Sequence, residues 1–565
     1  MLQVRDLRKS YGSTTVLDGV GFVVGERERV GLIGPNGSGK STLLRCIAGV
    51  DQPDAGAVVV TPPEATIGYL PQAFAENDTA TTVRGALLAA QADLAQAERA
   101  VQAAAEALAH DAAAAPDMDR RLAAYDAALA HFEALGGYDR ERRAESVLAG
   151  LGLGSIDPAT PVAALSGGQK TRLGLATLLL REPTILLLDE PSNHLDVDAL
   201  AWLEDFVVQY PGAVLVVAHD RELLDHTVER IVWLDPETHA ARVYPGNYSA
   251  FAAAREHERQ LHLDTWRQQQ EYVARVERDV ARLKGEALGI ERATTPREPG
   301  VRKLAKKKAR LAKAREHKLE RYLESDERVD KPRLSWPLNL NFGPPPPGGR
   351  DVLAFQDVSF AYPGAQTLLA GVRLDVRYGE RLALVGPNGS GKTTLLRLAQ
   401  GALTPTTGTV RLGANVRLGV LAQEGETLDF GRTVLETVLD QRPMSETDAR
   451  RLLSFFLFYG DAAFRRVGVC SLGERTRLQL ALLVVRGCNL LLLDEPLNHL
   501  DVDGREHFAA ALDAFQGTII AVAHDRAFLR AFAERVVDVR AGQARVFEGG
   551  YASYTRSLAG GIGVI

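Results

Sequence analysis

The chain contains 565 residues, 46% hydrophobic and 24% charged, with a net charge of −6. This length accommodates roughly three to four domains of common size, and the negative charge argues against a general nucleic-acid binder. No apolar run approaches the ~20 residues that cross a bilayer, the N-terminal LQVRDL is typical of a strand rather than a signal peptide, and three cysteines are too few for a disulfide framework. We therefore expect a cytoplasmic protein with no membrane segment.

The first motif is a glycine-rich loop, GPNGSGKS at residues 34–41, between a strand-like VGLI and a helix-like TLLRCIAG. In this context the pattern predicts a P-loop, because its glycines let successive backbone N–H groups converge on phosphate oxygens at a helix N-terminus. The lysine reaches the outer phosphates, and the Ser41 hydroxyl ligates Mg²⁺. The nucleotide-binding candidates of this copy are Gly34, Asn36, Gly37, Gly39, Lys40, Ser41 and Thr42.

Residues 84–137 are predicted to form an antiparallel helical hairpin, called the arm below. Leu87, Leu94, Val101 and Leu108 recur every seven residues with alanines between them, and a second apolar stripe follows. Eight acidic residues against four basic ones make the arm a poor phosphate binder. We expect it to contact protein or to brace the domain that carries it.

Two acidic residues end the next strongly apolar strand, ILLLDE at 185–190. A buried strand that delivers a carboxylate beside a P-loop suits Mg²⁺ binding, so Asp189 is predicted to be a metal ligand. Glu190 is placed to orient or deprotonate an attacking water. A later strand ends at His219. A lone histidine is usually structural, but this one recurs in a second copy at the same offset as the acids, which favours sensing of the terminal phosphate.

Residues 251–335 are predicted to be a linker of two long helices. Heptad spacing runs from Trp266 to Ile290, and a loop with two prolines around 294–300 turns the chain. Residues 302–315 carry eight Lys or Arg and no acid, and residues 252–335 hold 22 bases against 15 acids. A basic run is most often a solvated helix face. Its concentration within an otherwise acidic protein instead favours a phosphate-binding site with salt-dependent affinity.

The nucleotide motifs occur a second time. The offset between copies falls from 351 residues for Gln72 and Gln423 to 305 for Asp189 and Asp494, so 46 extra residues lie between, where the arm is predicted. The second copy supplies Gly386, Asn388, Gly389, Gly391, Lys392, Thr393 and Thr394 for nucleotide, Thr393 and Asp494 for the metal, and Glu495 and His524 for catalysis.

These residues resemble the ATP-binding cassette (ABC) superfamily in both halves of the chain, and the family signature is intact as LSGGQ at 165–169. The resemblance implies an intramolecular pair of cassettes that closes on two ATP molecules and opens after hydrolysis, with the signature of one cassette facing the P-loop of the other. It assigns ATP contacts to Ser166 and Gly168, adenine stacking to Tyr11 and Tyr362, and contact with metal and attacking water to Gln72 and Gln423.

The second signature departs from this pattern, reading CSLGE at residues 470–474. Ser471 and Gly473 are retained as ATP-binding candidates, but a leucine replaces the first glycine and should hinder close backbone approach to a phosphate. By the cross-pairing rule the altered signature faces the ATP on Lys40, and the intact one faces the ATP on Lys392. We predict two occupied but unequal sites.

Two cassettes on one chain, an arm after the first glutamine motif and a charged helical linker look like the ABC-F family. That resemblance implies ribosome binding near the tRNA exit site, with the basic linker 302–315 contacting rRNA and tRNA. It leaves open a translation factor or a factor that protects the ribosome from antibiotics. Two other classes compete: the motor of a membrane transporter, which has no use for such a linker, and a DNA-associated ABC ATPase, which the missing zinc-ligand cysteines disfavour.

The predicted fold is therefore α/β, with two P-loop ABC-type nucleotide-binding domains in tandem, an inserted helical arm hairpin and a helical linker hairpin. We expect the first domain at 1–250, the linker at 251–335 and the second domain at 350–565.

Overall fold

The computed structural model describes residues 1–71, 82–110, 118–134, 137–193, 195–293, 299–325, 328–330, 349–421, 428–456, 458–498, 500–513 and 515–559. The chain divides into two compact units. One joins Met1–Tyr248 with Pro337–Ile565, and the other is Ser249–Trp336. The first unit contains both copies of the nucleotide motifs, and the second contains the basic linker.

The first copy is built on a six-stranded sheet of order β5-β6-β7-β3-β8-β9, parallel except for the last pair. Its central strands are apolar and buried throughout, as expected for a sheet covered on both faces. The strands are β3 (Arg29–Ile33), β5 (Ile67–Leu70), β6 (Ile185–Asp189), β7 (Ala213–Val217), β8 (Arg230–Leu234) and β9 (Ala241–Pro245).

A smaller antiparallel sheet of order β2-β1-β4 stands beside it, formed by β1 (Leu2–Tyr11), β2 (Thr14–Val24) and β4 (Ala55–Val60). Its apolar face and the central strands share one core, which includes Leu2, Leu17 and Leu43. The helices of this copy are α1 (Lys40–Ile47), α2 (Val83–Ala90), α3 (Ala92–His110), α4 (Met118–Ala134), α5 (Arg140–Gly150), α6 (Gly167–Leu180), α7 (Val197–Gln209) and α8 (Arg221–Thr227).

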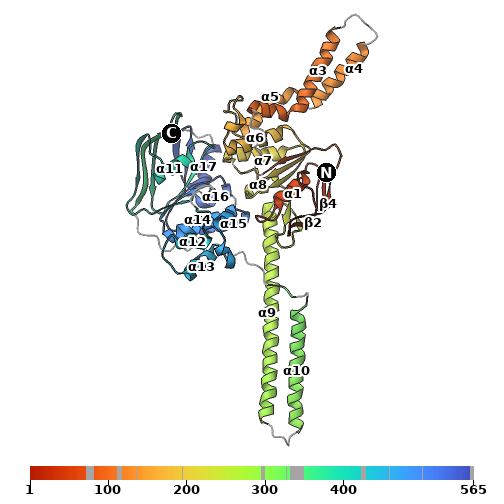
Figure 1. Cartoon of the computed structure of the whole chain (residues 1–565), viewed down its shortest axis with the longest axis vertical. Coiled ribbons are helices and arrows are strands. Elements are labelled where there is room, and N and C mark those ends of the chain that lie inside the picture. Colours follow the sequence, from red (N-terminus) through yellow and green to blue (C-terminus); the bar gives the residue numbers. More distant parts are fainter. Residues whose placement is uncertain are drawn as a thin grey trace. The chain divides into compact units, whose positions relative to one another are not determined.

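The predicted arm is present as α3 and α4, which lie side by side (Figure 1). Ala97 on α3 is buried, and a side chain this small lets neighbouring helices approach closely. Leu88 and Leu122 remain exposed, so the apolar surface of the arm is only partly covered.

The second copy repeats the same topology. Its sheets have the orders β14-β15-β16-β12-β17-β18 and β11-β10-β13. The strands are β10 (Asp351–Ala361), β11 (Thr367–Arg377), β12 (Arg381–Val385), β13 (Thr407–Leu412), β14 (Leu418–Leu421), β15 (Leu490–Asp494), β16 (Thr518–Val522), β17 (Arg535–Arg540) and β18 (Gln543–Glu548). The helices are α11 (Lys392–Gln400), α12 (Val434–Leu439), α13 (Glu446–Phe455), α14 (Leu472–Arg486), α15 (Val502–Asp513), α16 (Arg526–Phe532) and α17 (Gly550–Ala559), with short 3-10 turns at Gly460–Phe464 and Val467–Val469.

The linker unit consists of two long helices, α9 (Tyr248–Ala293) and α10 (Pro299–Leu323) (Figure 1). Val280 and Leu283 of α9 pack with Ala312 of α10 in a narrow apolar seam. Three ion pairs flank this seam and join the helices: Lys284–Glu316 at 2.7 Å, Lys308–Glu286 at 2.6 Å and Arg315–Asp279 at 2.9 Å. The predicted linker hairpin is therefore confirmed as an antiparallel helix pair.

Candidate nucleotide-binding sites

Both P-loops have the backbone shape that phosphate binding needs. Gly39 and Gly391 precede α1 and α11 with φ of 96° and 104°, a region that favours glycine. A Cβ on Gly39 would meet a methyl of Val16 at 2.8 Å. The loops thus expose N–H groups at two helix N-termini, an arrangement suited to anions.

The P-loop lysines are buried, and the side chain of each contacts the backbone of its own loop. Lys40 Nζ donates to the carbonyls of Gly34 and Pro35 at 2.8 and 2.9 Å, and Lys392 makes the equivalent bonds in the second copy at the same distances. Burial lowers the pKa of both ammonium groups. The carbonyl contacts hold each lysine side chain beside its own loop, placed to turn toward phosphate oxygens.

Asp189 ends β6 with only 1% of its surface exposed. Among the described residues, neither of its carboxylate oxygens has a well-formed hydrogen bond. Burial raises its pKa to about 6, an effect that the Ser41 hydroxyl partly opposes. Asp494, at the end of β15, is in a similar state. Its Oδ1 has no hydrogen-bond partner within the described ranges, and burial raises its pKa. Buried carboxylates left this way are costly unless a cation joins them, so both sites fit Mg²⁺.

Glu190, one residue after Asp189, has a strained backbone with φ of 50°. Asn193 Nδ2 donates to its Oε2 at 2.6 Å, and His219 Nε2 lies 3.4 Å from its Oε1. Burial opposes ionisation of this glutamate, but the contacts with His219 and Asn193 outweigh burial and lower its pKa to about 2. Its carboxylate is thus ionised and held in one orientation.

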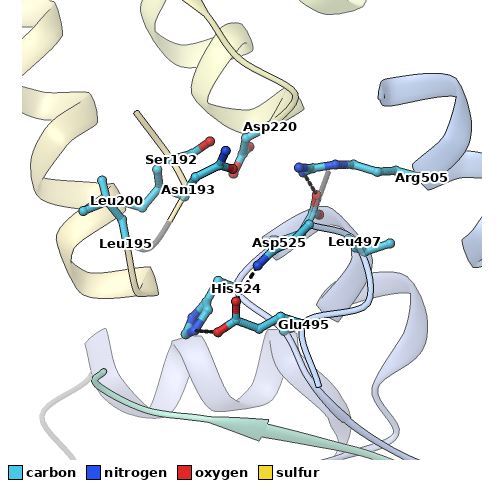
Figure 2. A pocket seen from close by; sticks show the side chains of 12 residues that line it. Ser192, Asn193, Leu195, Leu200, Asp220, Glu495, Leu497, Arg505, His524 and Asp525 are labelled. Atoms are coloured by element: carbon cyan, nitrogen blue, oxygen red, sulfur yellow. Dashed lines mark hydrogen bonds and ion pairs between the residues drawn. The ribbon is translucent and has the colours of Figure 1, made fainter. Parts of the chain in front are cut away.

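The second copy repeats the arrangement. Glu495 has φ of 48°, its carboxylate accepts a hydrogen bond from the Asn498 amide, and His524 Nε2 lies 3.6 Å from its Oε1. Figure 2 shows Glu495 and His524 in a pocket that Asn193 and Asp220 of the first copy also line. Residues of both copies therefore face one another at this point.

Both signature motifs begin a helix in the same way. Ser166 Oγ caps α6 by accepting from the Gln169 backbone N–H, and Gln169 Oε1 accepts from the Ser166 backbone N–H. Ser471 and Glu474 form the same capping box on α14. The caps preserve helix geometry in spite of the sequence change between the two signatures.

The two signatures differ in their first helical turn. Leu472 occupies the first helical position of α14, where α6 has Gly167, whereas Gly168 and Gly473 share the second position. Glu474 is paired with Arg465. Burial opposes ionisation of Glu474, but its bond from the Ser471 backbone and its pairing with Arg465 outweigh burial and lower its pKa. The altered signature therefore adds an anionic side chain to its first helical turn.

Two aspartates connect each copy to the P-loop of the other. Asp196 Oδ2 accepts from the Asn388 backbone N–H at 2.9 Å, and Asp501 Oδ2 accepts from the Asn36 backbone N–H at 3.2 Å. The other oxygen of each aspartate caps its own helix, α7 or α15. Neither aspartate was among the predicted site residues; their recurrence at an offset of 305 residues was the available signal.

The two copies also share ion pairs away from the P-loops. Arg526 contacts Glu204 and lies 3.2 Å from Glu222, Arg530 lies 2.5 Å from Glu222, and Arg540 lies 2.9 Å from Asp198. The bases come from the second copy and the acids from the first. This ionic cluster joins α16 and β17 of the second copy to α7 and α8 of the first.

The remaining predicted residues are Tyr11, Tyr362 and the two glutamines. Both tyrosines are half-exposed, with the Tyr11 hydroxyl 2.8 Å from Asp51 and the Tyr362 hydroxyl 3.2 Å from Thr394. Gln72 and Gln423 lie outside the described residues, so their predicted roles stay predictions. None of the helices in the described ranges is both long enough and apolar enough to span a membrane.

Comparison with known proteins agrees with this architecture. A family profile described as "ABC transporter" matches residues 17–193 and 369–498, and a second profile with the same description matches 234–337. The chain is 36% identical over 556 residues to the tylosin resistance ATP-binding protein TlrC of Streptomyces fradiae, covering 96% of this chain and 97% of that protein.

Two further relatives extend the comparison. ABC transporter F family member 5 of Arabidopsis thaliana is 33% identical over 559 residues, covering 98% of this chain and 77% of that protein. The energy-dependent translational throttle protein EttA of Mycobacterium tuberculosis is 32% identical over 573 residues, covering 99% and 96%. The matches cover both copies and the linker, so the predicted fold of two tandem nucleotide-binding domains with a helical hairpin between them is confirmed.

Proposed function

The chain belongs to the ABC-F family of tandem-cassette ATP-binding proteins, and from that premise we propose that it hydrolyses ATP with Mg²⁺ and acts on the ribosome. We propose binding near the tRNA exit site in the cytoplasm, either as a translation factor or as a factor that protects the ribosome from antibiotics. The names of two relatives support these two roles: one relative is called a translational throttle protein and the other a tylosin resistance protein. The domain boundaries given above are part of the same proposal.

The site residues support hydrolysis as follows. Asp189 and Asp494, with Ser41 and Thr393, would hold Mg²⁺, which when bound neutralises charge on the phosphates. Glu190, with a pKa of about 2, is a weak base but a good hydrogen-bond acceptor at neutral pH. It would therefore orient the attacking water rather than remove its proton before the reaction. His219, whose pKa burial lowers, would be a neutral hydrogen-bonding partner near the terminal phosphate.

Closure and phosphate binding are coupled through Asp196 and Asp501. Each aspartate links the helix cap of one copy to a P-loop N–H of the other. Any movement that separates the copies breaks these bonds. The backbone N–H groups of Asn36 and Asn388, which belong to the phosphate-binding loops, then lose their aspartate partners. Nucleotide binding and the distance between the copies therefore affect one another through these contacts.

The observation that carries the ribosome proposal is a stripe of bases on α10. Lys303, Lys306, Lys307, Arg310 and Lys313 are exposed, line one groove and have no ion pair within the described part of the hairpin. Their spacing of three and four residues places them on one helical face over about 15 Å. Phosphate groups along a folded RNA present negative charge over such a length, and their binding releases counterions.

The structure also separates these bases from others in the same run. Lys308 and Arg315 face α9 and pair with Glu286 and Asp279. They hold the hairpin together and are largely neutralised. The proposed RNA contact within 302–315 is therefore limited to the stripe of exposed bases, Lys303, Lys306, Lys307, Arg310 and Lys313.

The test uses the full chain with Glu190→Gln and Glu495→Gln, which should close on ATP without releasing it. We expect ATP-dependent sedimentation with purified ribosomes that weakens steeply with salt. Neutralising Lys306, Lys307 and Arg310 to glutamine should weaken this association strongly and reduce the slope of log K against log salt by about two.

The matched control neutralises Lys284, Lys308 and Arg315, an equal number of charges taken from the inter-helix pairs. It should retain most of the ribosome affinity while lowering the melting temperature of the hairpin. Equal loss in the two triple variants would refute the stripe as the contact, and ATP-dependent recovery with membranes in place of ribosomes would favour a transporter motor.

A further inference from the structure

The ring of Tyr11 is held at its hydroxyl by two charged residues. The hydroxyl donates to Asp51 Oδ2 at 2.8 Å and accepts from Arg45 Nη2 at 3.0 Å. Arg45 Nε also donates to Asp51 Oδ2 at 2.8 Å, which closes the triangle. Arg45 lies on α1, the helix that the P-loop opens. The triangle thus connects the tyrosine to the same helix that begins at Lys40.

The second copy holds its tyrosine differently. Tyr362 makes one hydroxyl contact, at 3.2 Å with Thr394, and its ring packs edge-on against Phe360 at 4.9 Å. Counted from the P-loop lysines, Arg397 stands where the first copy has Arg45, and Leu403 stands where it has Asp51. Leu403 packs against the apolar core. The charged triangle is therefore a property of the first copy.

The triangle is not explained by fold stability. The side chains of Arg45 and Asp51 are 39% and 26% exposed, and ion pairs this accessible to water contribute little to stability. What the three bonds do fix is the rotation of the Tyr11 ring about its side-chain torsions, since the hydroxyl is restrained from two directions. A ring already held in its bound orientation loses less entropy when a flat ligand stacks on it.

We propose that Arg45 and Asp51 are positioning residues, which fix the Tyr11 ring for the nucleobase of the first site. Nucleotide affinity at the first site then depends on a contact that the second site lacks. This inference rests on nucleotide binding by the cassettes and is independent of any role at the ribosome. The bond from Arg45 Nη2 to the Tyr11 hydroxyl also ties the ring to α1, the helix that the P-loop opens.

The experiment measures ATP binding by isothermal titration calorimetry on the full chain carrying Lys392→Ala, which leaves the first site. Tyr11→Phe keeps the ring and removes the hydroxyl, and Asp51→Ala removes one restraint. Each should weaken ATP binding about three- to tenfold, the range expected for one net hydrogen bond. Tyr11→Phe and Asp51→Ala both remove the bond at the same hydroxyl. The double variant should therefore bind ATP no more weakly than whichever single variant has the lower ATP affinity.

Two controls separate positioning from damage to the fold. In a Lys40→Ala chain, which leaves the second site, Asp51→Ala should not change ATP affinity, and Arg397→Gln should not change it either. With both P-loops intact, Asp51→Ala should raise KM for ATP while kcat stays within about twofold. Unchanged affinity, additive losses in the double variant or loss in the Lys40→Ala chain would overturn the inference, and no binding by the parent Lys392→Ala chain would refute the first nucleotide site itself.

Discussion

Asp196 of the first copy accepts a hydrogen bond from the backbone N–H of Asn388 in the second, at 2.9 Å, while its other carboxylate oxygen caps α7. One side chain thus terminates a helix and contacts the P-loop of the opposite copy. Asp501 repeats this toward Asn36 at 3.2 Å. The two functions of Asp196 can be separated by substitution.

Asp196→Asn should preserve the helix cap, because asparagine caps as well as aspartate, but weaken the charge-assisted bond to Asn388. We expect kcat for ATP hydrolysis to fall about tenfold, the equivalent of 1.4 kcal/mol, with an unchanged melting temperature. Asp196→Ala should lose both contacts and also destabilise the fold by about 1 kcal/mol. Steady-state ATPase assays and thermal unfolding check this; equal melting temperatures of the two variants would contradict the capping role.

The two glutamates that we propose to orient the attacking water should contribute unequally to turnover. The intact signature at Ser166 is predicted to face the ATP on Lys392, whose water is oriented by Glu495, whereas the altered signature faces the ATP on Lys40. Glu495→Gln should therefore remove most turnover, and Glu190→Gln should remove less. Rates of phosphate release by the two single variants measure this directly, and equal losses would count against unequal sites.

The stability of the nucleotide-free chain should depend on pH through Asp189. Its pKa is raised to about 6 by burial, above the ordinary value near 3.9, so the folded state binds its proton more tightly than the unfolded state. The destabilisation from this carboxylate is then full above pH 6 and is relieved as pH falls toward 4.

Asp189→Asn removes that ionisation. It should stabilise the nucleotide-free chain by about 1–3 kcal/mol at pH 7.5, and the gain should shrink at pH 5. Thermal unfolding at both pH values provides the measurement. Addition of Mg²⁺ and ATP should stabilise the parent chain much more than Asp189→Asn, and a gain that does not vary with pH would argue against ionised Asp189 as its source.

The pairs of Arg526 with Glu204 and Glu222 should matter to stability because these three side chains are largely buried. Arg526→Gln removes the cation that contacts both Glu204 and Glu222 and leaves Arg530 beside Glu222, and the loss of a buried partner of this kind costs about 3–5 kcal/mol. The control is Arg259→Gln, which removes an exposed pair with Glu256 and should change stability by less than about 1 kcal/mol. Urea unfolding of the two variants compares these costs; similar midpoints would show that the cluster contributes little.

Local chemistry determined much of what the sequence revealed. The P-loops, the acids that end buried strands and the helical periodicity of the arm and linker are read from neighbouring residues, because a phosphate cradle or a helix face is built within a short stretch of chain. The repeat offset then located the arm insertion between Gln72 and Ser166. Altered residues such as Leu472 were visible for the same reason.

Tertiary structure decided which of these residues meet. Asp196 contacts Asn388 across 192 residues of sequence, and Tyr11 contacts Asp51 across 40, so no local pattern reports either bond. Lys307 and Lys308 are neighbouring residues of the same type and charge, yet of the two only Lys308 is paired with α9. The orientation of α10 about its own axis decides which bases face α9. The sequence by itself determined the kinds of chemistry present, because those depend on residue type and spacing; the packing of helices and copies decided which charges are neutralised and which remain available.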